Sequence, residues 1–179
     1  MSEILTLARQ LGFSQVSALN TAALVPLPQV REMCAADRCR SYGRSWSCPP
    51  ACGSLEQTAE RLAAYSGGVI VQTTGIMADD FDLEAIRETE QLHKTRFLTL
   101  ARQVRCLQPD CLPLTAGACT LCRKCAYPDR PCRFPGKMLS SMEAYGLLVS
   151  DVCIKSGLKY YYGPGTITFT ACILTEKGR

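Results

Sequence analysis

The sequence predicts a single α+β domain over 1–179, in which a small mixed sheet is flanked by helices. Three observations support this fold class. Several segments carry apolar residues at helical spacing, and others carry β-branched residues in the alternation typical of strands. The length of 179 residues suits one domain, and a content of 47% apolar residues is enough to build a core. We expect about five strands and four or five helices.

The predicted helices follow from apolar spacing and from capping residues. The first covers 2–11 and has Ser2 as its candidate N-cap. A capping box of Ser54 and Gln57 predicts the next long helix, over 54–65. The other predicted helices are a brief one from Pro28 to about Cys34, a long one from Leu83 to Arg105, and one over 147–156 that follows a second capping box, formed by Ser140 and Glu143.

The predicted strands are rich in β-branched residues. They cover 15–19, 69–76 after Gly67 and Gly68, and 112–116. The end of the chain predicts a hairpin, in which 158–162 is turned by G-P-G into 166–174. In the last strand Ile167, Phe169, Ala171 and Ile173 share one face, so we expect Cys172 to lie on the other, more polar face.

A cysteine-rich loop over 117–135 is the most specific motif of the chain. Cys119, Cys122 and Cys125 recur every third residue, and Cys132 follows near a proline. Bacterial ferredoxins hold [4Fe-4S] clusters with a similar run of cysteines. Structural zinc sites usually have two C-x2-C pairs that are further apart, although four thiolates can hold either metal. The spacing predicts a [4Fe-4S] cluster, with zinc as the alternative.

A second cysteine-rich loop covers 34–53 and contains Cys34, Cys39, Cys48 and Cys52. Its glycines and prolines prevent a regular element, so a bound metal would explain how the loop is ordered. The spacing is not a standard motif, and the fourth ligand is the least certain. We predict a second [4Fe-4S] cluster here. The aromatic residues of this loop, Tyr42 and Trp46, either shield a cluster from water or pack as ordinary core residues.

The remaining candidate residues have simpler interpretations. Glu90 and His93 form a Glu-x-x-His pair, but carboxylate-bridged metal sites need a second copy on another helix. We therefore expect His93 to be a structural histidine that is hydrogen-bonded to a neighbour. Four cysteines lie outside the two loops: Cys106, Cys111, Cys153 and Cys172. Cys106 and Cys111 could be extra ligands or a redox pair, but none of the four has neighbours that suggest catalysis.

Composition indicates a soluble, cytoplasmic protein. The N-terminus has no signal-peptide pattern, and no apolar run is long enough to span a membrane. Twelve cysteines in such a protein favour metal or redox chemistry over disulfides. The net charge is +4, but two clusters of about −2 each would offset it.

Lysines and arginines crowd both loops. They either compensate anionic clusters or form a docking patch for an acidic redox partner. The few aromatic residues near them disfavour nucleic-acid binding.

Three motifs together resemble one known family: Y-G-R-S-W-S-C-P-P-A-C-G, G-A-C-T-L-C-R-K-C-A-Y-P-D-R-P-C-R-F-P and S-M-E-A-Y-G. This is a prokaryotic family, frequent in anaerobes, of predicted metal-binding proteins of unknown function. The resemblance covers most of the chain. It implies metal ligands at the cysteines of both loops, and it assigns no reaction.

We predict a protein that binds two clusters and relays single electrons to or from a partner enzyme. One alternative is an enzyme in which one cluster has an open iron and binds substrate. Another is a zinc-stabilised interaction module or a redox-sensing regulator. The chain contains no P-loop, G-x-G-x-x-G or nucleophile elbow, so nucleotide and acyl chemistry have no support.

Overall fold

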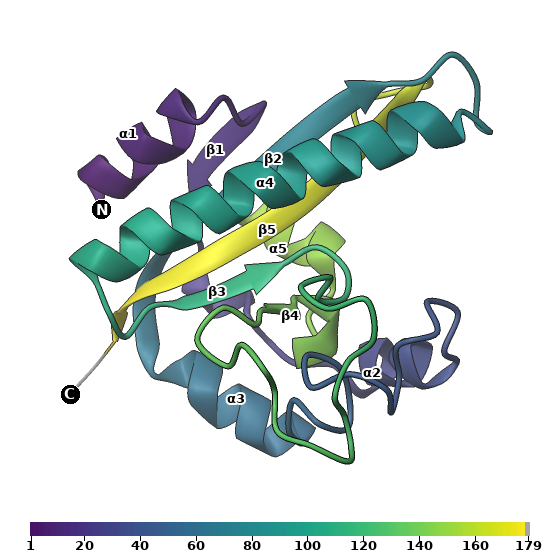
Figure 1. Ribbon diagram of the computed structural model, residues 1–179. Coiled ribbons are helices and arrows are strands. Elements are labelled where there is room, and N and C mark those ends of the chain that lie inside the picture. The colour runs from purple at the N-terminus through teal and green to yellow at the C-terminus, as the bar shows by residue number, and fades with distance from the viewer. Residues whose placement is uncertain (178–179) are drawn as a thin grey trace.

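The computed structural model describes residues 1–177 and shows a five-stranded mixed sheet with helices on both faces (Figure 1). This confirms the predicted α+β class. The strand order is β1-β2-β5-β3-β4, and every pair is antiparallel except β3 with β4. The strands are β1 (Gln15–Ala18), β2 (Tyr65–Ile76), β3 (Leu112–Thr115), β4 (Ser140–Ser141) and β5 (Thr166–Lys177).

Two helices cover one face of the sheet. They are α1 (Ser2–Gln10) and the long α4 (Leu83–Leu107), which crosses β2 and β5 in Figure 1. The core on this side joins the helices to alternate residues of the two central strands. Its members include Ile4 and Ala8 from α1, Phe97, Leu100 and Val104 from α4, and Val69, Val71, Ala171 and Ile173 from the sheet.

Shorter elements cover the other face. They are η1 (Thr21–Ala23), α3 (Leu55–Ala63), η2 (Glu143–Tyr145) and α5 (Val149–Lys155), while α2 (Pro28–Ala35) lies beside η2. The core on this side contains Leu62, Tyr145 and Val152 from these elements, together with Ile70, Cys172 and Leu174 from the central strands. Because both faces of the sheet are covered, β2 and β5 are apolar on both sides.

The predicted C-terminal hairpin is wrong. Strand β5 pairs along its length with β2, and β3 pairs with its other edge only from Cys172 to Leu174, while the segment 158–162 forms no strand. That segment instead packs over the buried Gln72: the Tyr162 hydroxyl donates to Gln72 Oε1 over 2.7 Å, and Gln72 Nε2 donates to the Lys159 carbonyl over 2.9 Å. The expectation that Cys172 lies on a polar face is also wrong, because its side chain is 0% exposed and belongs to an apolar core.

Local capping signals were partly right. The capping box of Ser54 and Gln57 is confirmed, with both reciprocal hydrogen bonds at the start of α3. Ser2 is not an N-cap, since α1 begins at Ser2 and its N-cap is Met1. The second capping box is also wrong: Ser140 belongs to β4, and Glu143 begins the short η2. None of the helices within 1–177 is both long and apolar enough to cross a membrane.

Gly68 lies inside β2, not before it, and its missing side chain is a packing requirement. A Cβ atom built there would lie 2.6 Å from the Ile173 carbonyl oxygen and 2.8 Å from a methyl carbon of Leu19. We expect Gly68→Ala to lower the free energy of unfolding by about 1–3 kcal/mol, the usual cost of overpacking. Denaturant unfolding checks this. The control is Gly136→Ala, where a Cβ meets nothing within 4 Å, and equal effects of the two changes would contradict the assignment.

Candidate metal centres

The two cysteine-rich loops lie next to each other beside the sheet. One connects α2 to α3 and the other connects β3 to β4, and in Figure 1 they lie together below the sheet. A hydrogen bond of 3.2 Å from the Cys119 amide to the Ser47 hydroxyl confirms that they touch. Segments that are about seventy residues apart in sequence therefore form one region of the surface.

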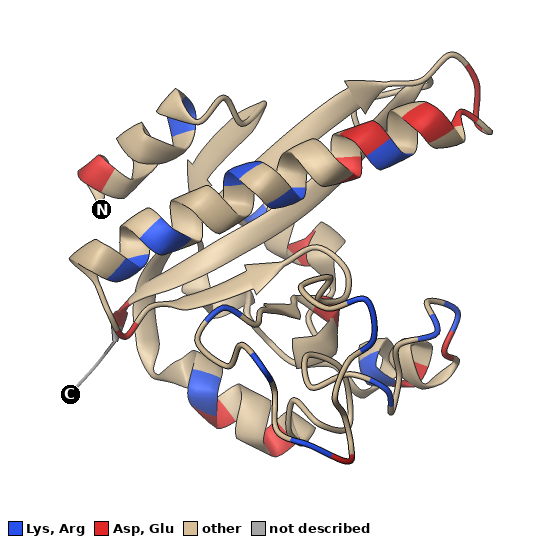
Figure 2. Ribbon diagram, viewed as in Figure 1, with Lys and Arg blue, Asp and Glu red and all other residues tan. Residues whose placement is uncertain are grey.

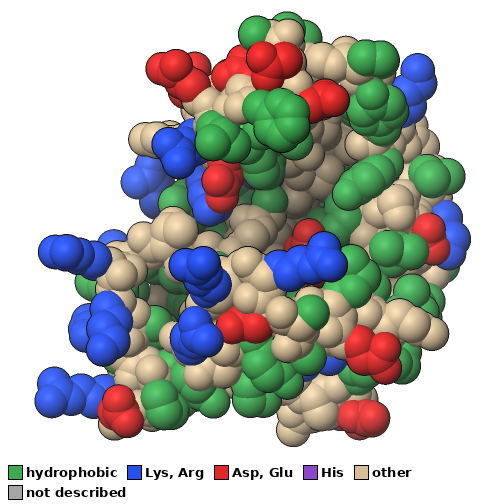
Figure 3. All heavy atoms as spheres, turned by 90° about the vertical axis from the view of Figure 1, so that its right-hand side faces the viewer, with side chains coloured by type: hydrophobic (Ala, Val, Ile, Leu, Met, Phe, Trp, Pro, Cys, Tyr) green, Lys and Arg blue, Asp and Glu red, His purple; other side chains and the backbone are tan. Residues whose placement is uncertain are grey.

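Positive charge gathers on this region. Figure 2 shows Lys and Arg along both loops, and acidic residues at the far end of α4 and in the turn before it. Figure 3 shows a cluster of acidic side chains at the top of the view, and several basic side chains that project from its lower part among scattered acidic ones. The exposed basic residues of the two loops are Arg38, Arg40, Arg44, Arg123, Lys124, Arg130, Arg133 and Lys137.

The second loop places its cysteines around one small cavity. Cys119, Cys122, Cys125 and Cys132 all line this cavity, and all four are half-buried. Its wall is completed by residues that include Trp46, Phe134 and Met138. Four thiols that line one small cavity match the number and type of donors of a tetrahedral thiolate site, either an iron–sulfur cluster or zinc.

Polar groups surround the Cys125 sulfur. Burial acts to raise the pKa of this thiol, but the backbone amides of Tyr127, Trp46 and Ala126 and the Ser45 hydroxyl stabilise the thiolate, and together they lower the pKa. Two of these four donors come from the first loop. Hydrogen bonds of this kind to cysteine sulfur are one means by which proteins tune iron–sulfur clusters.

The first loop groups its cysteines less completely. Cys34, Cys39 and Cys48 line a second cavity of about 330 Å³, and Cys52 does not line it. Two of the sulfur atoms lie against carbonyls of η2, with Cys34 Sγ 3.7 Å from the Glu143 oxygen and Cys52 Sγ 3.3 Å from the Ala144 oxygen. Burial, then Glu143 and Cys39, raise the pKa of Cys34 to about 11.

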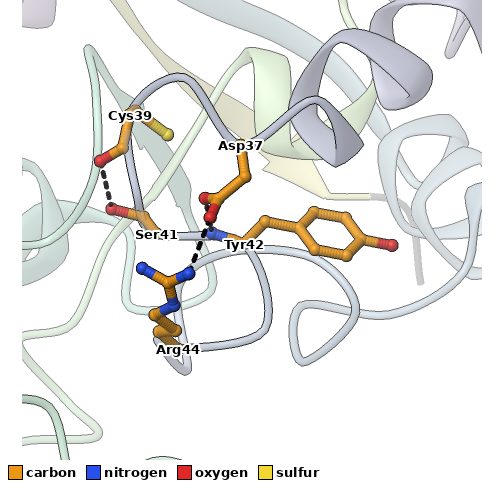
Figure 4. Close-up of polar contacts among 5 residues, drawn as sticks. All are labelled: Asp37, Cys39, Ser41, Tyr42 and Arg44. Atoms are coloured by element: carbon orange, nitrogen blue, oxygen red, sulfur yellow. Dashed lines mark hydrogen bonds and ion pairs between the residues drawn. The ribbon is translucent and has the colours of Figure 1, made fainter.

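The turn that carries Cys39 is held by one carboxylate. Asp37 accepts a hydrogen bond from the Tyr42 amide over 2.9 Å and pairs with Arg44 at 3.0 Å (Figure 4). The Ser41 hydroxyl donates to the Cys39 carbonyl at 3.3 Å. The turn that carries the exposed Cys39 contains no helix or strand. The position of Cys39 therefore depends on these few polar contacts.

Arg31 supplies a positive charge at the first group. Its Nη1 atom donates to the Gly53 carbonyl over 2.8 Å, while Nε and Nη2 are buried and have no hydrogen-bond partner within 1–177. Its charge acts to lower the pKa of both Cys34 and Cys52, against the larger effect of burial. A buried cation without a partner is costly. An anionic group held by these thiolates would satisfy it, so the residues present fit such a group.

A short segment of the first loop connects the two groups of cysteines. Ser47 Oγ lies 3.0 Å from Ser45 Oγ and 3.7 Å from Cys48 Sγ, besides accepting the Cys119 amide. Trp46 Nε1 donates to the Arg130 carbonyl over 3.0 Å, and its ring meets Tyr127 edge-on at 4.9 Å. Sequence analysis did not single out Ser45 or Ser47, because a serine in a loop carries no signal of which sulfur or amide it will contact.

The other cysteines lie outside both groups. Cys153 and Cys172 are 0% exposed and belong to the core beneath α5. Cys106 is exposed at the end of α4. Cys111 is half-buried and lines a cavity of about 590 Å³ whose wall also includes Cys52.

A family model described as Predicted metal-binding protein (DUF2284) matches residues 17–175. The chain belongs to this family. The match confirms the resemblance seen in the three motifs and spans both cysteine loops. No curated protein and no solved structure matches the chain.

Metal binding is therefore the predicted property of this family. In the part of the chain from 1 to 177, no group of three or more His, Cys, Asp or Glu side chains is arranged to hold a metal ion. The identity of the metal and the ligand set stay predictions that need metal analysis.

His93 is a core residue of this predicted metal-binding protein, as the sequence suggested. Its ring is 0% exposed, Nδ1 lies 3.0 Å from the Thr73 hydroxyl, and Phe13, Phe97 and Phe169 surround it. Glu90 pairs with Lys94 instead of facing a metal. Burial, then the charges of Arg96 and Lys94, lower the pKa of His93 to about 4.

A histidine with a lowered pKa makes stability depend on pH. Between pH 6.5 and 4 the unfolded chain binds a proton that the folded chain excludes, so stability is complete above 6.5 and falls as the pH drops. From pH 7 to pH 5 we expect the wild type to lose about 2 kcal/mol more than His93→Gln, as measured by anaerobic urea unfolding. Equal losses would show that His93 is not buried as a neutral ring.

Proposed function

We propose that the protein binds two [4Fe-4S] clusters and transfers single electrons to or from a partner protein. One cluster would be held by Cys34, Cys39, Cys48 and Cys52, and the other by Cys119, Cys122, Cys125 and Cys132. A bound cluster supplies a one-electron redox centre, whose potential depends on hydrogen bonds, charge and exposure. The proposal includes a cytoplasmic location, which agrees with all twelve cysteines being free thiols.

One observation carries the proposal: the cysteines at the ferredoxin-like spacing share a single enclosed cavity. The packing of the helices and strands does not require the four thiols to line one cavity. The loop also has few backbone hydrogen bonds that would order it by itself. The donors that converge on Cys125 would stabilise a metal-bound thiolate in the same way as a free one. Zinc is the alternative occupant, because it also accepts four thiolates.

The contacts between the loops support a relay with two centres. Ser47 touches both Cys48 and the amide of Cys119, and Ser45 lies beside Cys125. The two sets of thiols are therefore neighbours, with Cys119 close enough to contribute to the raised pKa of Cys48, which is due mainly to burial. In a two-centre relay these residues would hold the loops at a constant separation and exclude water between them.

The charge of the surface supports an acidic partner. Eight exposed basic residues lie on the two loops themselves, so a negatively charged protein would be attracted to the face nearest the thiols. Arg44 is already paired with Asp37, which reduces its contribution. The acidic end of α4 would repel the same partner and so orient it.

A second candidate function is catalysis at an open iron of the first cluster. The observation that favours it is the position of Cys52, which lines the cavity of about 590 Å³ instead of the cavity shared by Cys34, Cys39 and Cys48. If Cys52 were not a ligand, three thiolates would hold that cluster and one iron would be accessible. Iron content after Cys52→Ala separates the two cases, because a three-ligand cluster would survive the change.

Metal analysis of anaerobically purified protein tests the proposal. We expect about eight iron and eight labile sulfide per chain, and Cys122→Ala should lose about four of each while the other cluster is kept. The control is Cys106→Ser, which changes an exposed thiol outside both groups. Zinc without sulfide would exclude the relay, and an unchanged iron content in Cys122→Ala would contradict that ligand.

Arg31 provides a test of the first cluster alone. Removal of a buried positive charge disfavours the more negative, reduced state, so we expect Arg31→Gln to lower one midpoint potential by about 60 mV, a tenfold change for one electron. Arg31→Lys should restore most of the potential because it keeps the charge. The measurement is a redox titration followed by EPR. If Arg31→Gln left both potentials unchanged, an anionic group beside Arg31 would be excluded.

A further inference from the structure

The cavity that is lined by Cys52 and Cys111 has the size of a small-molecule site. Its volume is about 590 Å³, and it lies between α3, the end of α4, β3 and the segment before β4. Binding sites for small ligands usually measure about 300–1,000 Å³ and combine apolar walls with a few polar groups. Leu112, Leu114, Met138 and Leu139 form the apolar part of this wall.

Two arginines give the cavity its charge. Arg61 comes from α3 and Arg105 from the last turns of α4. Arg61 Nη1 donates to the Tyr145 hydroxyl, and Arg105 Nη1 donates to the Gly136 carbonyl, each over 2.7 Å. Neither belongs to the ion pairs found within 1–177, and no Asp or Glu of those residues lines the cavity. Both guanidinium groups keep further N–H donors and an uncompensated charge.

The cavity adjoins both groups of candidate ligands. Cys52 of the first group lies in its wall, and Trp46 and Met138 line it as well as the cavity of the second group. Cys111, which belongs to neither group, is also in the wall. A molecule bound here would lie next to the predicted metal centres and could be exchanged with solvent through the open side of the cavity.

We propose that this cavity binds a small organic anion, with a carboxylate or phosphate head on Arg61 and Arg105 and an apolar body against the leucines of β3 and Leu139. Arginine is suited to both heads because its planar fork of donors matches their oxygen atoms. This site goes beyond the proposed electron relay. It does not depend on which metal the thiols hold.

Alkylation of Cys111 reports occupancy of the cavity. The full protein, purified without oxygen, is treated with neutral iodoacetamide, and modification of each cysteine is followed by mass spectrometry. We expect hexanoate and hexyl phosphate to slow the reaction at Cys111 and not at the exposed Cys106. Hexanamide has the same apolar body without the charge. It should protect Cys111 at least about tenfold less well than hexanoate, because it cannot form a charge-assisted hydrogen bond with the arginines. Acetate should also be weaker, because it lacks the apolar body.

Substitutions identify the groups that hold the head. Arg61→Gln and Arg105→Gln should each weaken protection by hexanoate about tenfold. The matched control is Arg87→Gln on the exposed side of α4, which should change nothing. The buried thiols Cys153 and Cys172 check the fold of every variant, since they become reactive only if the core opens.

The outcomes separate the anion site from the relay. The relative potency of hexanoate and hexyl phosphate identifies the preferred head. Equal protection by hexanamide, full protection in both arginine variants, or no protection by either anion in the millimolar range would overturn the anion site. Iron and sulfide measured in the same samples show independently whether the metal proposal holds.

Discussion

The structure depends on strand β5, which is hydrogen-bonded on both edges and covered on both faces. Its pairing with β2 and β3 joins the C-terminal strand to two strands from the middle of the chain, and its alternate side chains enter two separate cores. The register of a strand that is buried on both faces is fixed, because a shift by one residue would exchange the side chains of its two faces. The position of β3 follows from this pairing, and β3 leads directly into the second cysteine loop.

The loops themselves are ordered by each other. The segment from Ser45 to Cys48 contacts the other loop through serine hydroxyls, a tryptophan N–H and a backbone amide. Several of these contacts end at a thiol or beside one. A long irregular loop loses conformational entropy when it is ordered, and needs such contacts or a bound group to offset the loss. The cavity of the second cysteine group and the arginine-lined cavity therefore share part of their walls, because Trp46 and Met138 line both.

Local patterns predicted most of the elements, because helices and strands with one buried face carry their period in the sequence. The long α4, the capping box of α3 and the sheet-forming segments were found in this way. The errors occurred where distant pairing decided the outcome. Residues 158–162 were expected to pair with β5, yet they form no strand and are held over Gln72 of β2. Ser140 follows a capping-box pattern, yet it pairs with Leu114 in the sheet.

The sequence by itself determined the family, the α+β class and two sets of cysteines, because family motifs, apolar periods and cysteine spacing are local properties of the chain. Only the tertiary structure decided that the two loops touch, that Cys52 faces a different cavity from the other cysteines of its loop, and that two arginines from separate helices face one apolar wall. These features depend on contacts between segments far apart in the chain, and no local pattern records which segments the packing of the sheet brings together.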